Sequence, residues 1–168
     1  MARILGRLIC VFFAFVVITG GANAYTLTST EGHFVAEFPG EPKLEKSTAK
    51  TASGVTFNSS KWIFGSSDGT QVWLITMATY STSVTRNYAV NISGAVAASK
   101  GKLVSQKTIR QSGVEGREIL IDLGDSDEAR ERMLWIGDRY YQIGFIGKTG
   151  TTSAPDVDTF LNSFQATK

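Results

Sequence analysis

Residues 70–80 constrain the fold most strongly. Their pattern predicts a β-strand, and both faces of this strand are apolar. Side chains alternate across a strand, so residues two apart share a face. One face carries Val72, Leu74, Ala78 and Tyr80, and the other carries Trp73, Ile75 and Met77. Residues 133–136 and 141–146 show the same pattern. A sheet with two apolar faces needs cover on both sides, so the sequence predicts a layered structure.

Strand patterns occupy most of the chain after residue 24. They fall in residues 25–29, 33–38, 43–51, 55–64, 70–80, 102–110, 114–123, 129–136 and 139–147. Asp68-Gly69 is a hairpin turn signal, and residues 111–113, 124–127 and 137–138 form the short links after residue 102. Such links predict an antiparallel meander. Residues 43–51 are polar and alternating, which favours an exposed or edge strand.

Two segments with helical spacing provide the cover. Residues 83–100 have Ser83 or Thr85 as the candidate N-cap and Gly101 after the helix end. Residues 155–164 have Pro155 in the first turn and Ser153 as the candidate cap. Their apolar stripe consists of Val157, Phe160, Leu161 and Phe164. The predicted class is α+β: an antiparallel β-sheet of about six or more strands with helices packed on its faces.

Residues 1–24 have the three-part pattern of a secretory signal peptide. Arg3 and Arg7 precede an uninterrupted apolar run over residues 8–18, which is shorter than the about 20 residues of a bilayer span. Ala24 ends a small-residue cleavage site, so we predict cleavage between Ala24 and Tyr25. This leaves one periplasmic or secreted domain over residues 25–168, with no stable membrane span. A short membrane anchor is the alternative.

Removal of the signal changes both the charge and the thiol content. The full chain has 17 basic and 15 acidic residues, and losing Arg3 and Arg7 leaves 15 of each. A neutral chain has no overall field that would attract it to nucleic acid or anionic lipid. Cys10, the single cysteine, leaves with the signal. The mature domain therefore depends on its core and not on disulfides.

His33 is the single histidine, so a Ser-His-Asp or Cys-His site would have to use it. It stands beside a turn with no nucleophile motif near it. One histidine and no thiol also disfavour a zinc site. We predict no catalytic residue and no cofactor. A periplasmic hydrolase that uses His33 with acidic residues is the alternative.

An acidic run formed by Asp122, Asp125, Asp127 and Glu128 suggests a calcium site at first reading. The run lacks the residue spacing of an EF-hand loop, and it lies between two predicted strands. A solvated hairpin loop explains it better. The sequence therefore predicts no metal site.

Arg117, Glu118 and Tyr140 are the candidate partner contacts. Residues 113–118 lack the Gly-Lys-Ser/Thr of a phosphate loop, and a strand follows where a helix is needed. Arg117 and Glu118 point to opposite faces of a regular strand, where cross-strand charge pairs are the preferred interpretation. Most aromatic residues on the strands belong to the core, and one or two left exposed would mark a ligand or protein contact.

Four stretches carry a resemblance to a known group of proteins. They are residues 33–43 (HFVAEFPGEPK), 113–118 (GVEGRE), 138–143 (DRYYQI) and 160–164 (FLNSF). Their order and spacing resemble small exported bacterial domains of the PsbP-like fold. The resemblance implies an antiparallel sheet between helical layers. Its members are mostly accessory proteins: PsbP supports the oxygen-evolving side of photosystem II, and a nuclear-transport relative binds the GTPase Ran.

The resemblance implies a non-catalytic binding or assembly module, by analogy of fold. We therefore expect an exported accessory or binding protein of the cell envelope, whose partner is an unknown envelope protein or small ligand. A deep pocket in which His33 and a carboxylate converge would favour the enzyme. An exposed patch containing Trp or Tyr would favour the binding protein. A purely structural envelope component would have neither feature.

Overall fold

The computed structural model describes residues 24–51, 54–80 and 84–167. Its strands are β1 (Tyr25–Ser29), β2 (Phe34–Phe38), β3 (Lys43–Lys50), β4 (Thr56–Gly65), β5 (Val72–Tyr80), β6 (Lys102–Gln111), β7 (Val114–Gly124), β8 (Asp127–Ile136), β9 (Arg139–Lys148) and β10 (Gln165–Ala166). Its helices are α2 (Tyr88–Ser99), the 3-10 turn η1 (Thr151–Ser153) and α3 (Pro155–Ser163). Most of the predicted signal lies outside these residues, and Tyr25 begins β1.

Seven antiparallel strands form the large sheet, in the order β3-β4-β5-β9-β8-β7-β6. The run from β6 to β9 is the predicted meander, and β5 then pairs with β9. The predicted edge position of β3 is confirmed. β1, β2 and β10 form a separate small sheet of three strands.

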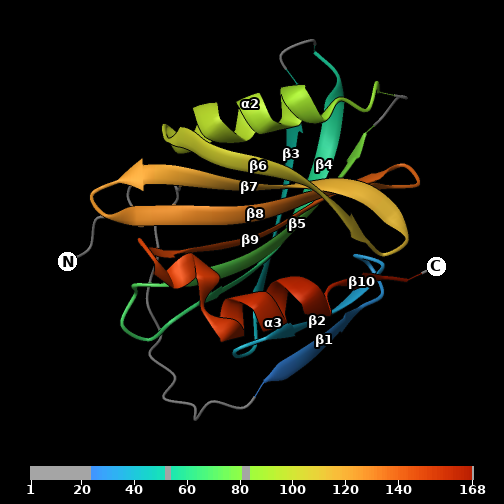
Figure 1. The fold of residues 1–168 in the computed structure, drawn as a ribbon. Coiled ribbons are helices and arrows are strands. Elements are labelled where there is room, and N and C mark those ends of the chain that lie inside the picture. Colours follow the sequence, from blue (N-terminus) through green and yellow to red (C-terminus); the bar gives the residue numbers. More distant parts are fainter. Residues whose placement is uncertain (1–23, 52–53, 81–83, 168) are drawn as a thin grey trace.

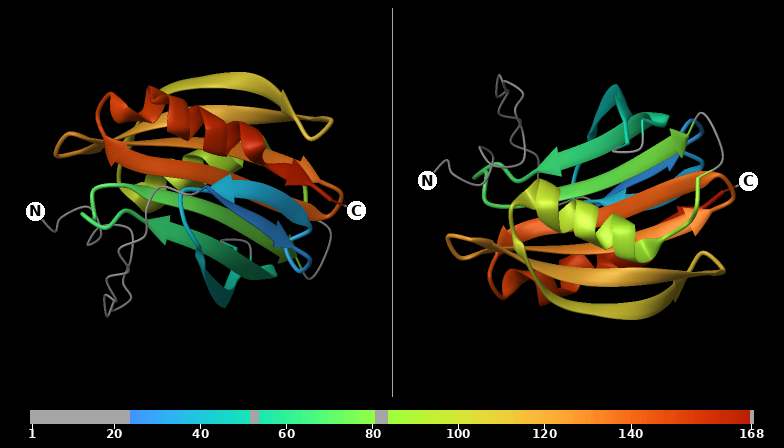
Figure 2. Two further views of the ribbon diagram at one scale, coloured as in Figure 1. Left: turned by 90° about the horizontal axis from the view of Figure 1, so that it is seen from below. Right: turned by 90° about the horizontal axis from the view of Figure 1, so that it is seen from above.

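Both faces of the large sheet are covered, as the two apolar faces of β5 require. α2 lies over one face, and α3 lies with the small sheet over the other (Figures 1 and 2). Trp73, Ile75 and Met77 belong to the core on the α3 side, whereas Leu74 and Ala78 belong to the core on the α2 side. The predicted α+β layered class is confirmed.

The cover on the α3 side differs from the prediction, because a sheet shares it with the helix. Phe38 of β2 packs against Phe160 of α3, with ring centroids 5.0 Å apart. Phe164, predicted as the last helical residue, has extended backbone at φ −63° and ψ 122° and still lies fully in the core. It leads directly into β10, which is two residues long and too short to leave a pattern in the sequence.

The caps of both helices differ from those predicted. Asn87 caps α2, and its side chain accepts hydrogen bonds from the backbone of Ala89 and Val90. Thr85 does not cap the helix, and Ser83 lies outside the described residues. α3 begins after Ala154, so Ser153 is not its cap, while Pro155 occupies the first turn as predicted.

The end of α2 also differs from the prediction. Lys100, and not Gly101, takes the left-handed backbone there, at φ 54°. Gly101 instead allows a close approach to β7, because a Cβ added to it would lie 2.5 Å from Cγ2 of Ile121. Among the described residues, no helix has the length and apolar character needed to cross a membrane.

Candidate functional site

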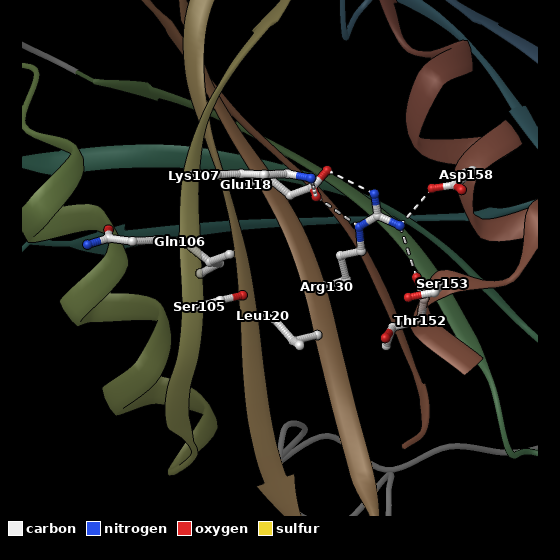
Figure 3. A pocket seen from close by; sticks show the side chains of 10 residues that line it. Ser105, Gln106, Lys107, Glu118, Leu120, Arg130, Thr152, Ser153 and Asp158 are labelled. Carbon is white, nitrogen blue, oxygen red and sulfur yellow. Dashed lines mark hydrogen bonds and ion pairs between the residues drawn. The ribbon is translucent and has the colours of Figure 1, made fainter. Parts of the chain in front are cut away.

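A polar pocket of about 390 Å³ lies between strands β6 to β8 and the η1–α3 segment (Figure 3). Side chains from five elements line it, among them Ser105, Lys107, Glu118, Arg130, Thr152 and Asp158. The meander brings the three strands side by side, and the turn at η1 places α3 across them. The pocket is therefore a product of tertiary packing and not of one local motif.

Glu118 is the centre of an ion network on the floor of this pocket. Lys107 and Arg132 stand directly opposite it on β6 and β8. The Lys107 Nζ lies 2.9 Å from Oε1 of Glu118, and Nε of Arg132 lies 2.7 Å from Oε2. Nε of Arg130 lies 3.1 Å from Oε1. These are the cross-strand charge pairs that the sequence favoured for Glu118.

The network keeps the Glu118 carboxylate charged. Burial alone would raise the pKa of this carboxyl, but hydrogen bonds from Lys107, Arg130 and Arg132 outweigh burial and lower the pKa to about 2. A general acid or base works best with a pKa near the operating pH. Glu118 is therefore poorly matched to general acid or base catalysis at neutral pH.

The two arginines and Gln111 also attach α3 to the large sheet. Nη1 of Arg130 donates to Oδ1 of Asp158 at 2.7 Å, and Nη1 of Arg132 donates to the carbonyl of Leu161 at 3.0 Å. Nε2 of Gln111 donates to the same carbonyl at 2.7 Å. The last carbonyls of a helix lack partners within the helix, and side chains of the sheet satisfy them here. The network thus holds α3 in place.

What remains available to a ligand in the pocket is a set of hydrogen-bond donors. The hydroxyls of Ser105 and Ser153 make no hydrogen bond with another described residue, and the exposed Lys107 has one charged partner among the described residues. Asp158 is already paired with Arg130. The pocket can therefore accept a polar ligand, but its charged groups are occupied by one another.

The candidate partner contacts of the sequence do not share one surface. Glu118 faces α3, whereas the Arg117 guanidinium lies 5.0 Å from the ring centroid of Tyr88 on α2 and pairs with Glu115 at 2.8 Å. Tyr140 is 8% exposed and packs against Trp135 under α2. Burial, followed by the nearby Glu131, raises the pKa of the Tyr140 hydroxyl well above its usual value. Of the three residues, Arg117 has the most accessible side chain.

His33 lies outside the pocket. It precedes β2 with a left-handed backbone, and its carbonyl accepts a hydrogen bond from the backbone of Thr167. Trp62, Trp73 and Trp135 are buried, as are Tyr140 and Tyr141. The lining of the polar pocket does not include His33, and none of the three tryptophans is exposed, so these two signs are not found there.

The acidic run forms a hairpin, as expected. Asp125 and Ser126 make the turn with left-handed backbone, while Asp127 already belongs to β8. Oδ1 of Asp127 lies 2.7 Å from Nζ of Lys148, and Glu128 accepts a hydrogen bond from Thr152. Within residues 24–51, 54–80 and 84–167, no cluster of three or more His, Cys, Asp or Glu is arranged to hold a metal ion.

An exposed surface at the start of β6 was not predicted from the sequence. We call Lys100, Lys102, Leu103 and Val104 the β6 surface. Leu103 is 40% exposed and Val104 is 56% exposed, and β6 is the last strand of the large sheet. The polar composition of β6 resembles that of β3, and this would have marked it as a second edge strand.

No family model matches the sequence, and no curated protein matches it. The chain is similar to the solution structure of cyanobacterial PsbP (CyanoP) from Synechocystis sp. PCC 6803, with 15% sequence identity and a TM-score of 0.49. The similarity covers 89% of this chain and 97% of that chain. No activity or partner of this chain follows from that similarity.

Proposed function

We propose that this chain is an exported accessory protein of the cell envelope that acts by binding and not by catalysis. The observation that carries the proposal is the β6 surface, where two large apolar side chains stay exposed next to lysines on an edge strand. Contiguous exposed apolar side chains rimmed by polar residues are typical of interaction sites. The export signal expected over residues 1–24 supports the location.

The chemistry of the polar pocket supports binding over catalysis. Its central carboxylate, Glu118, has a pKa of about 2, and its cations are paired with Glu118 and Asp158. A hydrolase that uses His33 with acidic residues remains the alternative function. It would require His33 to act away from this pocket. Loss of a measured hydrolytic activity in His33→Ala would favour that alternative.

The proposal is tested by locating the exported protein within the cell. We compare the unchanged chain with Val104→Asp and with the matched control Leu44→Asp. Leu44 is 44% exposed and lies on β3, the opposite edge strand. Both substitutions place a charge on an exposed edge position, so their effects on folding are comparable, which thermal unfolding would verify.

We expect the unchanged chain and Leu44→Asp to sediment with the envelope and to begin at Tyr25. Val104→Asp should move to the soluble exported fraction. Equal distribution of the three proteins would contradict the proposal. Recovery of the unchanged chain entirely in the soluble fraction would contradict it as well.

A further inference from the structure

The floor of the polar pocket contains one apolar side chain among its charged groups. Leu120 of β7 stands opposite Ser105 of β6 and opposite Arg130 of β8, so these three residues form a row across the floor. Leu120 is only partly buried, and Ser153 and Asp158 lie across the pocket from Ser105 (Figure 3). The volume of about 390 Å³ falls within the range of about 300 to 1,000 Å³ that is typical of small-ligand sites. A small ligand therefore has room between the sheet and the η1–α3 segment.

The charged side chains that line the pocket balance one another. The cations of the lining are Lys107 and Arg130, and its anions are Glu118 and Asp158. Each carboxylate oxygen of Glu118 already has two nitrogen partners, so neither oxygen is open to a metal ion. An anion placed beside either cation would meet the carboxylates of Glu118 and Asp158, and like charges repel. A charged ligand therefore fits this pocket poorly.

The groups that stay open to a ligand include both donors and acceptors. The hydroxyls of Ser105 and Ser153 have no hydrogen-bond partner in the part of the chain that the structure describes, and a hydroxyl both donates and accepts. Only Oδ1 of Asp158 is engaged by a described residue, which leaves Oδ2 as an acceptor. The ammonium of Lys107 has three N–H donors and one ion-pair partner among the described residues. These groups surround the apolar side chain of Leu120.

We infer that the polar pocket binds a neutral saccharide. Every sugar hydroxyl both donates and accepts, so a sugar can use the open donors and acceptors of both walls without bringing a charge into the pocket. Its hydroxyls bond to Ser105, Ser153 and Oδ2 of Asp158, and the C–H face of its ring packs on Leu120. This site is separate from the β6 surface and goes beyond the proposed function, on which it rests only for a location among envelope sugars. Free sugars and polymeric glycans share this chemistry.

Titration of the exported protein, followed by nuclear magnetic resonance, tests the inference. The neutral probes are the trisaccharide of N-acetylglucosamine and maltotriose, and inorganic phosphate is the anionic probe. At least one trisaccharide should shift the backbone amide resonances of Ser105, Leu120 and Ser153. Ser105→Ala removes one hydrogen bond and should weaken binding about fivefold, whereas Ser105→Trp fills the pocket and should abolish binding. The matched control is Ser47→Trp, at an exposed serine of edge strand β3, which should bind like the unchanged protein.

Thermal unfolding verifies that the variants fold. Shifts caused by phosphate alone, no shift with either trisaccharide, or equal binding by Ser105→Trp would overturn the inference. Sedimentation with insoluble peptidoglycan separates the two sources. If Ser105→Trp loses both trisaccharide binding and sedimentation, the ligand is a polymeric glycan, and trisaccharide binding without sedimentation assigns a free sugar. Sedimentation without trisaccharide binding would count against a saccharide. If Val104→Asp leaves the envelope in cells while no trisaccharide binds, the proposed function stands and this inference fails.

Discussion

At the residue scale, two glutamates on adjacent strands show how position on the sheet controls ionisation. Glu118 on β7 faces α3 and has three cationic partners, which lower its pKa to about 2. Glu131 on β8 faces α2 and accepts a hydrogen bond from Gln142. Burial raises the pKa of Glu131, and the bond from Gln142 opposes this only in part. The ionised form of glutamate is therefore favoured at position 118, and the protonated form is favoured at position 131 on the opposite face of the sheet.

Substituting each glutamate with glutamine should have opposite effects on stability at pH 7. Glu118→Gln leaves buried arginines without their counter-charge and should cost about 3 kcal/mol of unfolding free energy. Glu131→Gln removes a carboxyl that is costly to ionise in an apolar site and should add on the order of 1 kcal/mol. Urea unfolding of both variants measures this, and destabilisation by Glu131→Gln would contradict it.

The carboxyls of Glu118 and Glu131 also contribute to the free energy of unfolding over different pH ranges. The folded pKa of Glu118 lies below the ordinary 4.5, so its contribution is complete above pH 4.5 and is lost as the pH falls from 4.5 towards 2. The folded pKa of Glu131 is raised, so its contribution is lost as the pH rises above 4.5 through the folded value. In Glu118→Gln, the loss of unfolding free energy that Glu118 causes between pH 4.5 and 2 should be absent. In Glu131→Gln, the loss that Glu131 causes above pH 4.5 should be absent.

At the element scale, α2 depends strongly on its cap. Only Ile92 and Ser99 of this helix are buried, so tertiary packing holds it less firmly than it holds α3. Asn87→Ala removes both capping hydrogen bonds and should cost about 1 kcal/mol. The matched control is Thr85→Ala, which removes the cap that the sequence favoured and should leave stability unchanged. Thermal unfolding of the two variants distinguishes them, and equal losses would contradict the assignment.

The strands with a long alternating sequence pattern were predicted. Features whose position is set by tertiary contacts were not. The alternation in residues 102–147 predicted β6 to β9, because short links leave an antiparallel meander as the simple arrangement. Nothing local indicated that β1 and β2 leave the large sheet, since that depends on pairing with β10 at the far end of the chain. The cap at Asn87 was missed because several polar residues in a row are equally suited to that position.

The candidate site was predictable only in part. Glu118 and its pairing across strands followed from the sequence, because residue types and strand order were enough. The pocket was not predictable, since Thr152 and Asp158 reach it only through the turn at η1. The exposure of Val104 depends on a bulge, and a bulge leaves no mark in the alternation of ten residues.

At the scale of the whole molecule, the exposed apolar side chains of the β6 surface lie at one edge of the large sheet. The basic residues Lys102, Lys107 and Arg110 of β6 each stand opposite an acidic residue of β7, so the apolar side chains and not a positive field distinguish this edge. The large sheet, covered on both faces, provides the rigid support for it. We therefore expect function at an edge of the sheet and not in its core.

The most direct test of this account uses the absence of cysteine from residues 25–168. A fluorophore sensitive to polarity is attached to Val104→Cys or, as the control, to Leu44→Cys in the exported protein, and isolated envelope membranes are added. The account predicts a blue shift of the emission at position 104 and no change at position 44. A shift at position 44 alone, an equal shift at both positions, or no shift at either would contradict it.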